Sequence, residues 1–320
     1  MRAWHLLVLS AVLALPLQTA RARELTIGLL TQADDERYSA QALQDAYPEA
    51  PGGRSAIAAQ IAIDDSAFGL QGAGWSGAKL LPMEAADAAG LPAAGVAAVA
   101  QAARGKDVVL VNAAAPEDVL RAAQCAPNLL HTLPSQAMEM DALGQFLAAR
   151  KWGKPLVLAG PSPADQLLRA AFERSARRFG LKPVATKPFK LSNDPRERDL
   201  GNVRLLTAER DYDAVVVLDA GGEFARSVPY RTVLPRPVLG SNGLTARAWD
   251  ALYERNGAPQ LNRRFQRKAQ RPMTSYDWAT WVATRALIEA ASLPKASIAQ
   301  QLQALRSGTQ RIERGYEVGQ

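Results

Sequence analysis

The sequence holds one cysteine and two histidines among its 320 residues, and this scarcity excludes several kinds of site. Cys125 alone allows neither an internal disulfide nor a paired-cysteine zinc site, and we expect it to be buried as a small apolar residue. His131 ends a predicted strand, where a lone histidine more often packs or hydrogen-bonds than acts as a base. The nucleophile, phosphate-loop and zinc-protease motifs are also missing, so we expect no enzyme, no catalytic residue, no cofactor and no bound metal.

Long hydrophobic runs are missing as well once the first residues are set aside. No later stretch approaches the roughly 18 apolar residues of a membrane helix. The amino terminus itself has Arg2, an apolar run over residues 6–17 and the small-residue site Ala20-Arg21-Ala22, which together are typical of an export signal. We therefore predict a signal peptide at residues 1–22, cleavage after Ala22 and a periplasmic product.

The formal net charge of +7 is a modest surplus for this length. Its basic residues fall on predicted helices with apolar partners, which favours a solvated face over a nucleic-acid groove, so we expect no nucleic-acid partner. Acidic residues gather at predicted loops and strand ends, but their spacing matches no metal-binding loop and favours solvated carboxylates. They are Asp34, Asp35, Glu36, Asp64, Asp65, Asp219 and Glu223.

Strand and helix patterns alternate along most of the chain, which predicts an α/β fold with parallel sheets. Predicted strands cover residues 24–30, 78–83, 108–111, 128–132, 155–159, 182–189, 212–218 and 237–240. Predicted helices cover residues 55–68, 91–104, 135–151, 163–179 and 196–207, with a short one at Glu223. From residue 245 onward the pattern is helix after helix, and its strongest member, residues 275–291, carries Trp278 and Trp281, which we expect to pack a core.

The stretch 106–121 is the clearest strand-to-helix junction. An apolar run over residues 108–111 is followed by Asn112, three alanines and Pro116, and proline suits the first helical position. Glu117 and Asp118 then place carboxylates where the helix dipole favours them. The bend at residues 112–115 is either an ordinary βα turn or a ligand site with free backbone N–H groups, because ligands bind at the carboxyl ends of parallel strands.

Several blocks resemble a known family. The first strand, the alanine-rich helix ending in AIDD and the second unit are similar to the periplasmic branched-chain amino-acid-binding proteins of ABC importers, which have the type I fold. The blocks at residues 112–121, 125–143, 174–180, 211–224, 228–244 and 273–290 resemble one subgroup, which is associated with pyrroloquinoline-quinone-dependent alcohol dehydrogenase systems.

The resemblance implies two lobes, each a parallel sheet flanked by helices, that close on a small-molecule solute by hinge bending. The expected lobes are residues 23–134 plus 244–320 and residues 135–243. The implied partners are an inner-membrane ABC permease with its ATPase. Members usually return to the second lobe for a final strand pair, so the end at Gln320 leaves either a truncated chain or a hinge without that strand.

The expected ligand-binding residues lie at predicted strand ends. The amino-acid binders carry a hydroxyl in the bend after the third strand, and here that bend has none, which leaves backbone donors and Asn112. The set is Thr31, Asn112, Ala113, Ala114, Ser162, Asp219, Glu223 and Asn242.

Two other functions stay open. One is an accessory protein that docks on a periplasmic quinoprotein dehydrogenase or handles its cofactor or its metal, calcium or a lanthanide. The other, a hydrolase or transferase on an α/β scaffold, is the weakest because no pair of nucleophile and base is visible.

Overall fold

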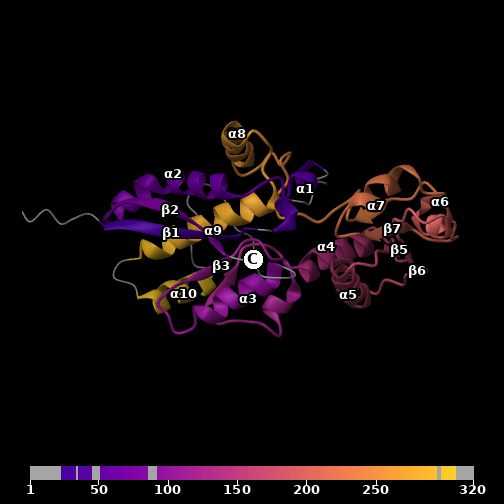
Figure 1. The fold of residues 1–320 in the computed structure, drawn as a ribbon, viewed down its shortest axis with the longest axis horizontal. Coiled ribbons are helices and arrows are strands. Elements are labelled where there is room, and N and C mark those ends of the chain that lie inside the picture. The colour runs from indigo at the N-terminus through magenta and orange to yellow at the C-terminus, as the bar shows by residue number, and fades with distance from the viewer. Residues whose placement is uncertain (1–22, 34, 45–50, 86–91, 294–296, 308–320) are drawn as a thin grey trace, which may run out of the picture.

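The computed structural model describes residues 23–33, 35–44, 51–85, 92–293 and 297–307. They form two lobes that lie next to each other along the long axis of the molecule (Figure 1). The predicted signal peptide and Asp34 fall outside the described residues. None of the helices described here is long and apolar enough to cross a membrane.

The first lobe holds two pairs of parallel strands. The strands are β1 (Arg23–Gln32), β2 (Trp75–Ala85), β3 (Leu110–Asn112) and β4 (Leu129–His131), and β1 pairs with β2 while β3 pairs with β4. Helix α2 (Ala56–Gly72) connects the first pair, and α3 (Pro92–Ala102) precedes the second. The short elements η1 (Glu36–Tyr38) and α1 (Ala40–Gln44) follow β1. Within the described residues no ladder joins the two pairs.

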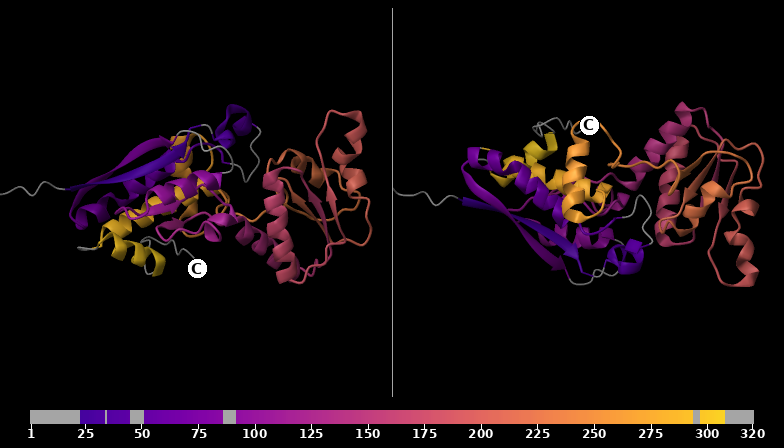
Figure 2. Two further views of the ribbon diagram at one scale, coloured as in Figure 1. Left: turned by 60° about the horizontal axis from the view of Figure 1, so that its bottom comes forward. Right: turned by 90° about the horizontal axis from the view of Figure 1, so that it is seen from above.

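The end of the chain returns to the first lobe as helices α8 (Ala258–Ala269), α9 (Ser275–Ala291) and α10 (Ile298–Ser307). Figure 2 shows this end of the chain, in orange and yellow, within the first lobe, where α9 contacts β1 and α10 packs on α9. Helix α9 lies against α2, and their contact buries Ile61 and Trp281. Residues far apart in the sequence therefore build one core.

Three tryptophans form a stack inside this core. Trp249 and Trp278 have ring centroids 4.9 Å apart, and Trp278 and Trp281 have centroids 5.2 Å apart. Phe265 and Leu261 of α8 pack in the same cluster. The prediction that Trp278 and Trp281 pack a core is confirmed.

The second lobe is one four-stranded parallel sheet. Its strands are β5 (Pro155–Ala159), β6 (Ala185–Pro188), β7 (Ala214–Leu218) and β8 (Val238–Gly240), in the spatial order β6-β5-β7-β8. Its longer helices are α4 (Gln136–Ala149) and α5 (Pro163–Arg178), and its short ones are α6 (Val203–Leu206) and α7 (Glu223–Ser227). The connections from β5 and from β7 lead to opposite sides, so the ends of these two strands form the switch point of the sheet.

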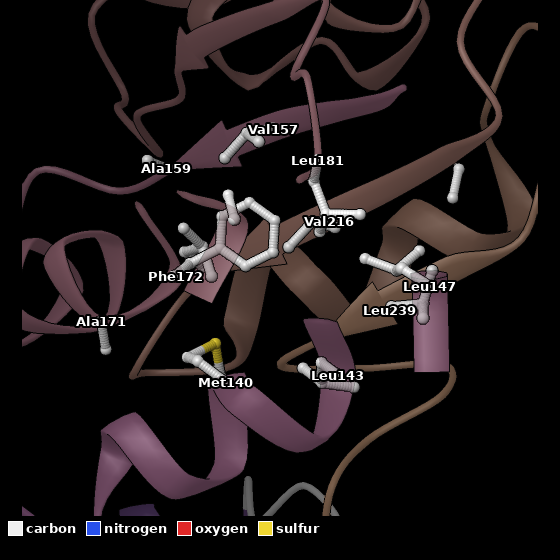
Figure 3. Close-up of a cluster of buried hydrophobic side chains, with 13 residues drawn as sticks. Met140, Leu143, Leu147, Val157, Ala159, Ala171, Phe172, Leu181, Val216 and Leu239 are labelled. Carbon is white, nitrogen blue, oxygen red and sulfur yellow. The ribbon is translucent and has the colours of Figure 1, made fainter. Parts of the chain in front are cut away.

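Strands β5 and β7 are apolar throughout because both faces of the sheet are covered. Val157 and Val216 face the α4 and α5 side, where Phe172 is fully buried among them (Figure 3). Leu158 and Val217 belong to the cluster on the opposite face. Alternate side chains of each strand therefore pack into two hydrophobic clusters, one on each face of the sheet.

The two lobes meet where α4 begins. The amide N–H of Gln136 donates to the Pro116 carbonyl over 2.9 Å, and that of Ala137 donates to Asp118 Oδ1 over 2.9 Å. The other oxygen of Asp118 pairs with Arg174 of α5. Asp118, in the first lobe, therefore holds the first turn of α4 and contacts the second lobe.

The predicted helix after Pro116 is wrong. The chain instead forms a four-residue 3-10 helix, η2 (Asp118–Arg121), and Glu117 has an extended backbone with ψ of 132°. Because Glu117 is extended, the Leu120 amide donates to the Glu117 carbonyl and not to that of Pro116, which accepts from Gln136 instead. The long-range contact with α4 outweighs the local helix signal.

Two further expectations are corrected. The predicted helix over residues 196–207 is divided into the 3-10 helix η3 (Pro195–Gly201) and α6, because Asn202 is extended and its side-chain oxygen accepts from the Arg204 and Leu205 amides. Cys125 is exposed rather than buried. It lies in the turn that ends η2, with its amide N–H bonded to the Ala122 carbonyl.

Candidate functional site

The bend after β3 is closed by its own asparagine. Asn112 Oδ1 accepts from the Ala114 and Ala115 amides over 3.1 and 2.9 Å, and Nδ2 donates to the Ala115 carbonyl over 2.7 Å. Asn112 is buried, whereas Ala113 and Ala114 are half-buried. The expected free N–H groups of Ala114 and Ala115 are therefore occupied, because the asparagine side chain takes the place that a ligand oxygen would have.

His131 completes this arrangement from the neighbouring strand. Its Nδ1 lies 3.1 Å from Asn112 Nδ2, so Nδ1 accepts and the proton resides on Nε2. Burial and the positive charge of Arg121 lower the pKa of His131 to about 4. The histidine acts as a neutral hydrogen-bonding residue, as its isolation in the sequence indicated.

Thr31 lies at the carboxyl end of β1. Its Oγ1 donates to the Met83 carbonyl of β2 over 3.4 Å, and the residue is half-buried. The Asn112 bend ends a strand of the other pair, and Arg37, which follows β1, connects the two strand ends by donating to the Ala114 carbonyl.

Ser162 caps helix α5 in the second lobe. Its Oγ accepts from the Asp165 amide, and the Ser162 amide N–H donates to Asp165 Oδ2 over 2.9 Å. The other oxygen of Asp165, a buried residue, accepts from the Ala220 amide over 2.7 Å. Asp165 thus ties together the loops after β5 and β7, and a Cβ on Gly160 would lie 2.3 Å from its Oδ2.

Asp219 organises the loop after β7. Its Oδ2 accepts from the Ala225 amide over 2.9 Å, and its own amide N–H donates to Ser241 Oγ over 2.9 Å. Burial raises the pKa of Asp219, and the nearby charge of Asp165 acts in the same direction. Asn242 binds the Ala225 carbonyl through Nδ2 over 3.3 Å, and Glu223 is exposed at the start of α7.

The predicted site residues therefore lie at the strand ends, but most of their polar atoms hold loops together. Glu223 is the exposed member of the set in the second lobe, and Asn242 is half-buried. The structure brings Ser162 and Asp219 together through Asp165, and Asn112 together with Ala113 and Ala114.

A second group of side chains at the first lobe was missed by the sequence analysis. It consists of Arg37, Tyr38, Arg54 and Tyr276, which we call the cation–aromatic cluster. The Arg54 guanidinium lies 5.1 Å from the Tyr38 ring centroid, and that of Arg37 lies 5.8 Å from Tyr38 and 5.5 Å from Tyr276. The four side chains form a ladder of alternating guanidinium groups and rings.

Asp35 and the Asn112 bend anchor this ladder. Asp35 pairs with Arg37 through contacts of 2.6 to 3.2 Å, and Arg37 Nη1 donates to the Ala114 carbonyl over 2.8 Å. Burial raises the pKa of Tyr276 to about 12 and also raises that of Tyr38. Both phenols are therefore neutral hydrogen-bonding groups across the physiological range.

Glu117 lies close to the same cluster and is buried. Its Oε2 has no hydrogen-bond partner among the residues that the structure describes. Burial raises the pKa of Glu117, and the charge of Arg37 acts against that shift. The cluster thus includes a carboxyl group that is costly to ionise.

The cation–aromatic cluster lies where the lobes meet. Arg37 follows β1, and Tyr276 is in the first turn of α9. The charge of Glu139, in the first turn of α4, contributes to raising the pKa of the Tyr276 phenol. Thr132, which precedes α4, donates to the Ala279 carbonyl over 2.8 Å. Figure 1 places α1, which follows the cluster, beside this junction.

The sequence carried little signal for this group. Asp35 stood in an acidic run with Asp34 and Glu36, Arg37 and Tyr38 followed it without a motif, and Tyr276 is 238 residues from Tyr38 by their numbering. Only tertiary packing brings them together.

The described residues offer no gathering of three or more histidine, cysteine, aspartate or glutamate side chains for a metal. Asp64 pairs with Lys268 over 2.7 Å, and Asp65 pairs with Arg264, so these two carboxylates join α2 to α8. A cavity of about 190 Å³ lies in the second lobe between α5, β5 and β6, lined by Phe172 and Leu181, and not at the strand ends.

Comparisons with known proteins agree with this architecture. Residues 78–229, just under half of the chain, match the sequence model of a family described as periplasmic binding protein. No curated protein matches the chain.

Solved structures of similar shape cover nearly the whole chain. One is an ABC transporter substrate-binding protein from Desulfitobacterium hafniense in complex with Leu, at 18% identity, a TM-score of 0.58 and coverage of 89% of this chain and 88% of that one. A solute-binding protein from R. palustris in complex with benzoate has 14% identity and a TM-score of 0.59, and the match covers 88% of this chain and 84% of that one. A branched-chain amino acid ABC transporter ligand-binding protein from Burkholderia xenovorans has 17% identity and a TM-score of 0.62, and the match covers 88% of this chain and 82% of that one. The chain therefore has the type I periplasmic binding protein fold, as the resemblance predicted.

Proposed function

We propose that this chain is the solute-binding component of an ABC importer, and that it closes on a small solute between its lobes. The observation that carries the proposal is the pair of parallel-sheet lobes joined at the start of α4. Three solved substrate-binding proteins share this fold over more than four fifths of their length. Such lobes close by hinge bending when a ligand contacts both.

The proposed site is formed by the strand-end edges of the two lobes. We assign Asn112, Ser162 and Asp219 the role of holding the bends, because their side chains bond backbone amides. Contact with the solute is left to Thr31, Ala113, Ala114, Glu223 and Asn242, which are exposed or half-buried. The cation–aromatic cluster extends this site in the first lobe.

The proposal includes the partners, the compartment and the lobe boundaries. The receptor would be exported by cleavage after Ala22, act in the periplasm and deliver its solute to an inner-membrane permease with an ATPase. The lobes would be residues 23–134 plus 244–320 and residues 135–243. Relatives of this fold are described as bound to Leu and to benzoate, so amino acids and aromatic acids are the first solutes to try.

A link to pyrroloquinoline-quinone-dependent alcohol oxidation is part of the proposal. It rests on the sequence blocks at residues 125–143 and 228–244, which resemble that subgroup. Small alcohols, aldehydes and the acids derived from them therefore belong in the same screen.

The test is a screen of small acids, alcohols and amino acids that follows tryptophan fluorescence, the melting temperature and X-ray scattering of the full mature chain. A ligand should raise the melting temperature by mass action and reduce the radius of gyration as the lobes close. Trp278 is two residues from Tyr276 and should report binding by fluorescence. If no compound changes any of the three signals, the proposal fails.

The alternative role as an accessory protein of a quinoprotein dehydrogenase has less support. Its metal version would need converging oxygen ligands, and the described residues contain no such group of three or more; Asp64 and Asp65 pair with basic residues, and Asp219 accepts from a backbone amide. Its docking version would be favoured if a pulldown with the purified chain retains the dehydrogenase and the solute screen is negative.

A further inference from the structure

The cavity of about 190 Å³ in the second lobe lies apart from the proposed solute site. Its floor is apolar and buried, because its four floor residues are each at most 7% exposed. They are Val157, Phe172, Ala176 and Leu181. Figure 3 shows the side chains of Val157, Phe172 and Leu181 next to one another. The floor therefore offers a guest no side-chain group that forms hydrogen bonds.

The mouth of the cavity is polar and open to solvent. On one side are three residues spaced four apart along α5, namely Arg169, Glu173 and Arg177. On the other side is Thr186 of β6, and it is exposed, as are Glu173 and Arg177. Arg169 Nε donates to Glu173 Oε1 over 2.8 Å. Charges this close to solvent are screened and contribute little to binding, so the affinity for a guest comes from the floor.

The sheet leaves this space because β6 is its edge strand. Helix α5 packs over β5 and β7. Thr186, which pairs in register with Val157 of β5, stays exposed beside it. Where α5 borders the cavity it carries Ala176, the smallest side chain that has a Cβ. A larger side chain at this position would fill part of the space.

The end wall of the cavity is fixed by the way α5 ends. The Leu181 amide donates to the Ala176 carbonyl over 2.8 Å, and the Gly180 amide donates to the Arg177 carbonyl over 3.4 Å. Gly180 has a φ of +68°, so these two bonds form the capping motif in which the residue after the glycine packs back on the last helical turn. Leu181 is therefore held against α5, and the wall is preformed.

The volume and the lining select the kind of guest. An apolar cavity of about 150 Å³ holds one benzene ring. The larger space here has room for a single ring or a short branched chain. A charged or strongly polar body would lose its hydration without gaining bonds from the floor. An uncharged apolar body, in contrast, is favoured by the area that it removes from water.

We propose that this cavity is a second binding site, for a small uncharged molecule with an apolar body of one ring or one short branched chain. A single polar group on the molecule would stay at the mouth, in contact with solvent. The site lies within one lobe, so binding to it needs no lobe closure, and the inference goes beyond the proposed function.

The test follows the methyl groups of the full mature chain by NMR during titration with cyclohexanol and with inositol. Both have a six-carbon ring and no charge, but inositol carries a hydroxyl group on every carbon. We expect cyclohexanol to shift the methyl signals of Val157 and Leu181 and to leave those of Leu252, which is 86% exposed and lies ahead of α8, unchanged. Inositol should shift none of them. Raising the salt from about 20 to about 500 mM should not weaken the binding of cyclohexanol, because it carries no charge.

A variant closes the site. Ala176→Leu should weaken the binding of cyclohexanol about tenfold or more, because the added side chain occupies the space. The matched control is Ala170→Leu, the same change at an exposed position of the same helix, and it should bind like the parent chain. Circular dichroism shows whether Ala176→Leu is folded, and if it is not, the methyl shifts of the unmodified chain decide.

Several results would overturn the inference. They are cyclohexanol leaving Val157 and Leu181 unshifted, inositol shifting them equally, or a folded Ala176→Leu binding as well as Ala170→Leu. X-ray scattering keeps this inference separate from the proposed function, because cyclohexanol bound in the cavity should leave the radius of gyration unchanged. A smaller radius with cyclohexanol would place it between the lobes and count against the cavity.

Discussion

The two lobes share a fold type but differ in how their parallel strands are joined and in which segments form their cores. The second lobe has four consecutive strands in one sheet, with a buried cluster on each face. The first lobe has two separate strand pairs, and helix α9 from the far end of the chain completes its core. One lobe is built from a continuous segment, whereas the other depends on contacts between the two ends of the chain.

The same contrast holds at the strand ends. The second lobe ties its loops with carboxylates, because Asp165 and Asp219 accept from backbone amides. The first lobe uses a neutral asparagine for its bend and adds guanidinium groups and rings. The two edges therefore differ in the groups that hold their loops, which are carboxylates in the second lobe and an asparagine with a guanidinium group in the first.

The largest expected effect comes from the core of the second lobe. Phe172→Ala should lower the free energy of unfolding by about 3–5 kcal/mol, because it opens a cavity in a fully buried cluster. Urea unfolding followed by circular dichroism measures it. The control is Phe68→Ala in the first lobe, where the ring is 87% exposed and the change should stay within about 0.5 kcal/mol. Equal losses in the two variants would contradict the assignment of the core.

The next largest effect is a pH dependence of stability that comes from His131 in the first lobe. The pKa of His131 is about 4 in the folded chain against 6.5 when unfolded, so the unfolded state binds the proton more readily. Its contribution is therefore complete above about pH 6.5 and is lost as the pH falls towards 4, by up to about 3 kcal/mol. Unfolding titrations at several pH values measure it. In His131→Leu this part of the pH dependence should vanish, and its persistence would assign it to another group.

A third comparison sets the two kinds of bend against each other. Asp165→Asn places an amide group among backbone N–H donors and should cost about 1.5–3 kcal/mol. Asn112→Ala leaves the buried Ala115 amide without its partner and should cost about 1–3 kcal/mol. Hydrogen exchange should show the loss of protection in the second lobe for the first variant and in the first lobe for the second. Loss spread equally over both lobes would argue against separate units.

The smallest effect on stability concerns the contact between the lobes. Asp118→Asn removes the ion pair with Arg174 and should change the free energy of unfolding by less than about 1 kcal/mol, because the pair is partly exposed. It should nevertheless shift the radius of gyration, because this pair joins η2 to α5. Asp141→Asn is the matched control, since Asp141 is 29% exposed against 27% for Asp118 and pairs with Arg178 within the second lobe. Identical scattering from both variants would contradict a role of Asp118 in lobe position.

The strands show what the sequence could predict. β5 and β7 were predicted within two residues because buried parallel strands are continuous apolar runs, which need no knowledge of neighbours. The helix after Pro116 was wrong because its signal was local, whereas the Pro116 carbonyl bonds Gln136 across the junction. The prediction that Cys125 is buried was wrong for a similar reason, because cysteine as a residue type favours burial but this one lies at the surface.

The site shows the same division. Asn112, Ser162 and Asp219 were predicted at the strand ends because the carboxyl ends of parallel strands share one edge. Their partners could not be predicted, since a side chain that caps a backbone amide has the same sequence pattern as one that binds a ligand. The cation–aromatic cluster had no pattern at all.

The sequence by itself determined the alternation of strands and helices, the buried strands of the second lobe and the helical return at the end. These follow from the spacing of apolar residues, which local geometry sets. Only the tertiary structure decided that Tyr276 lies beside Arg37, that Asp165 joins the loops after β5 and β7, and that Arg54 bonds the end of β1. Such contacts depend on where distant segments pack, and no short-range pattern encodes that.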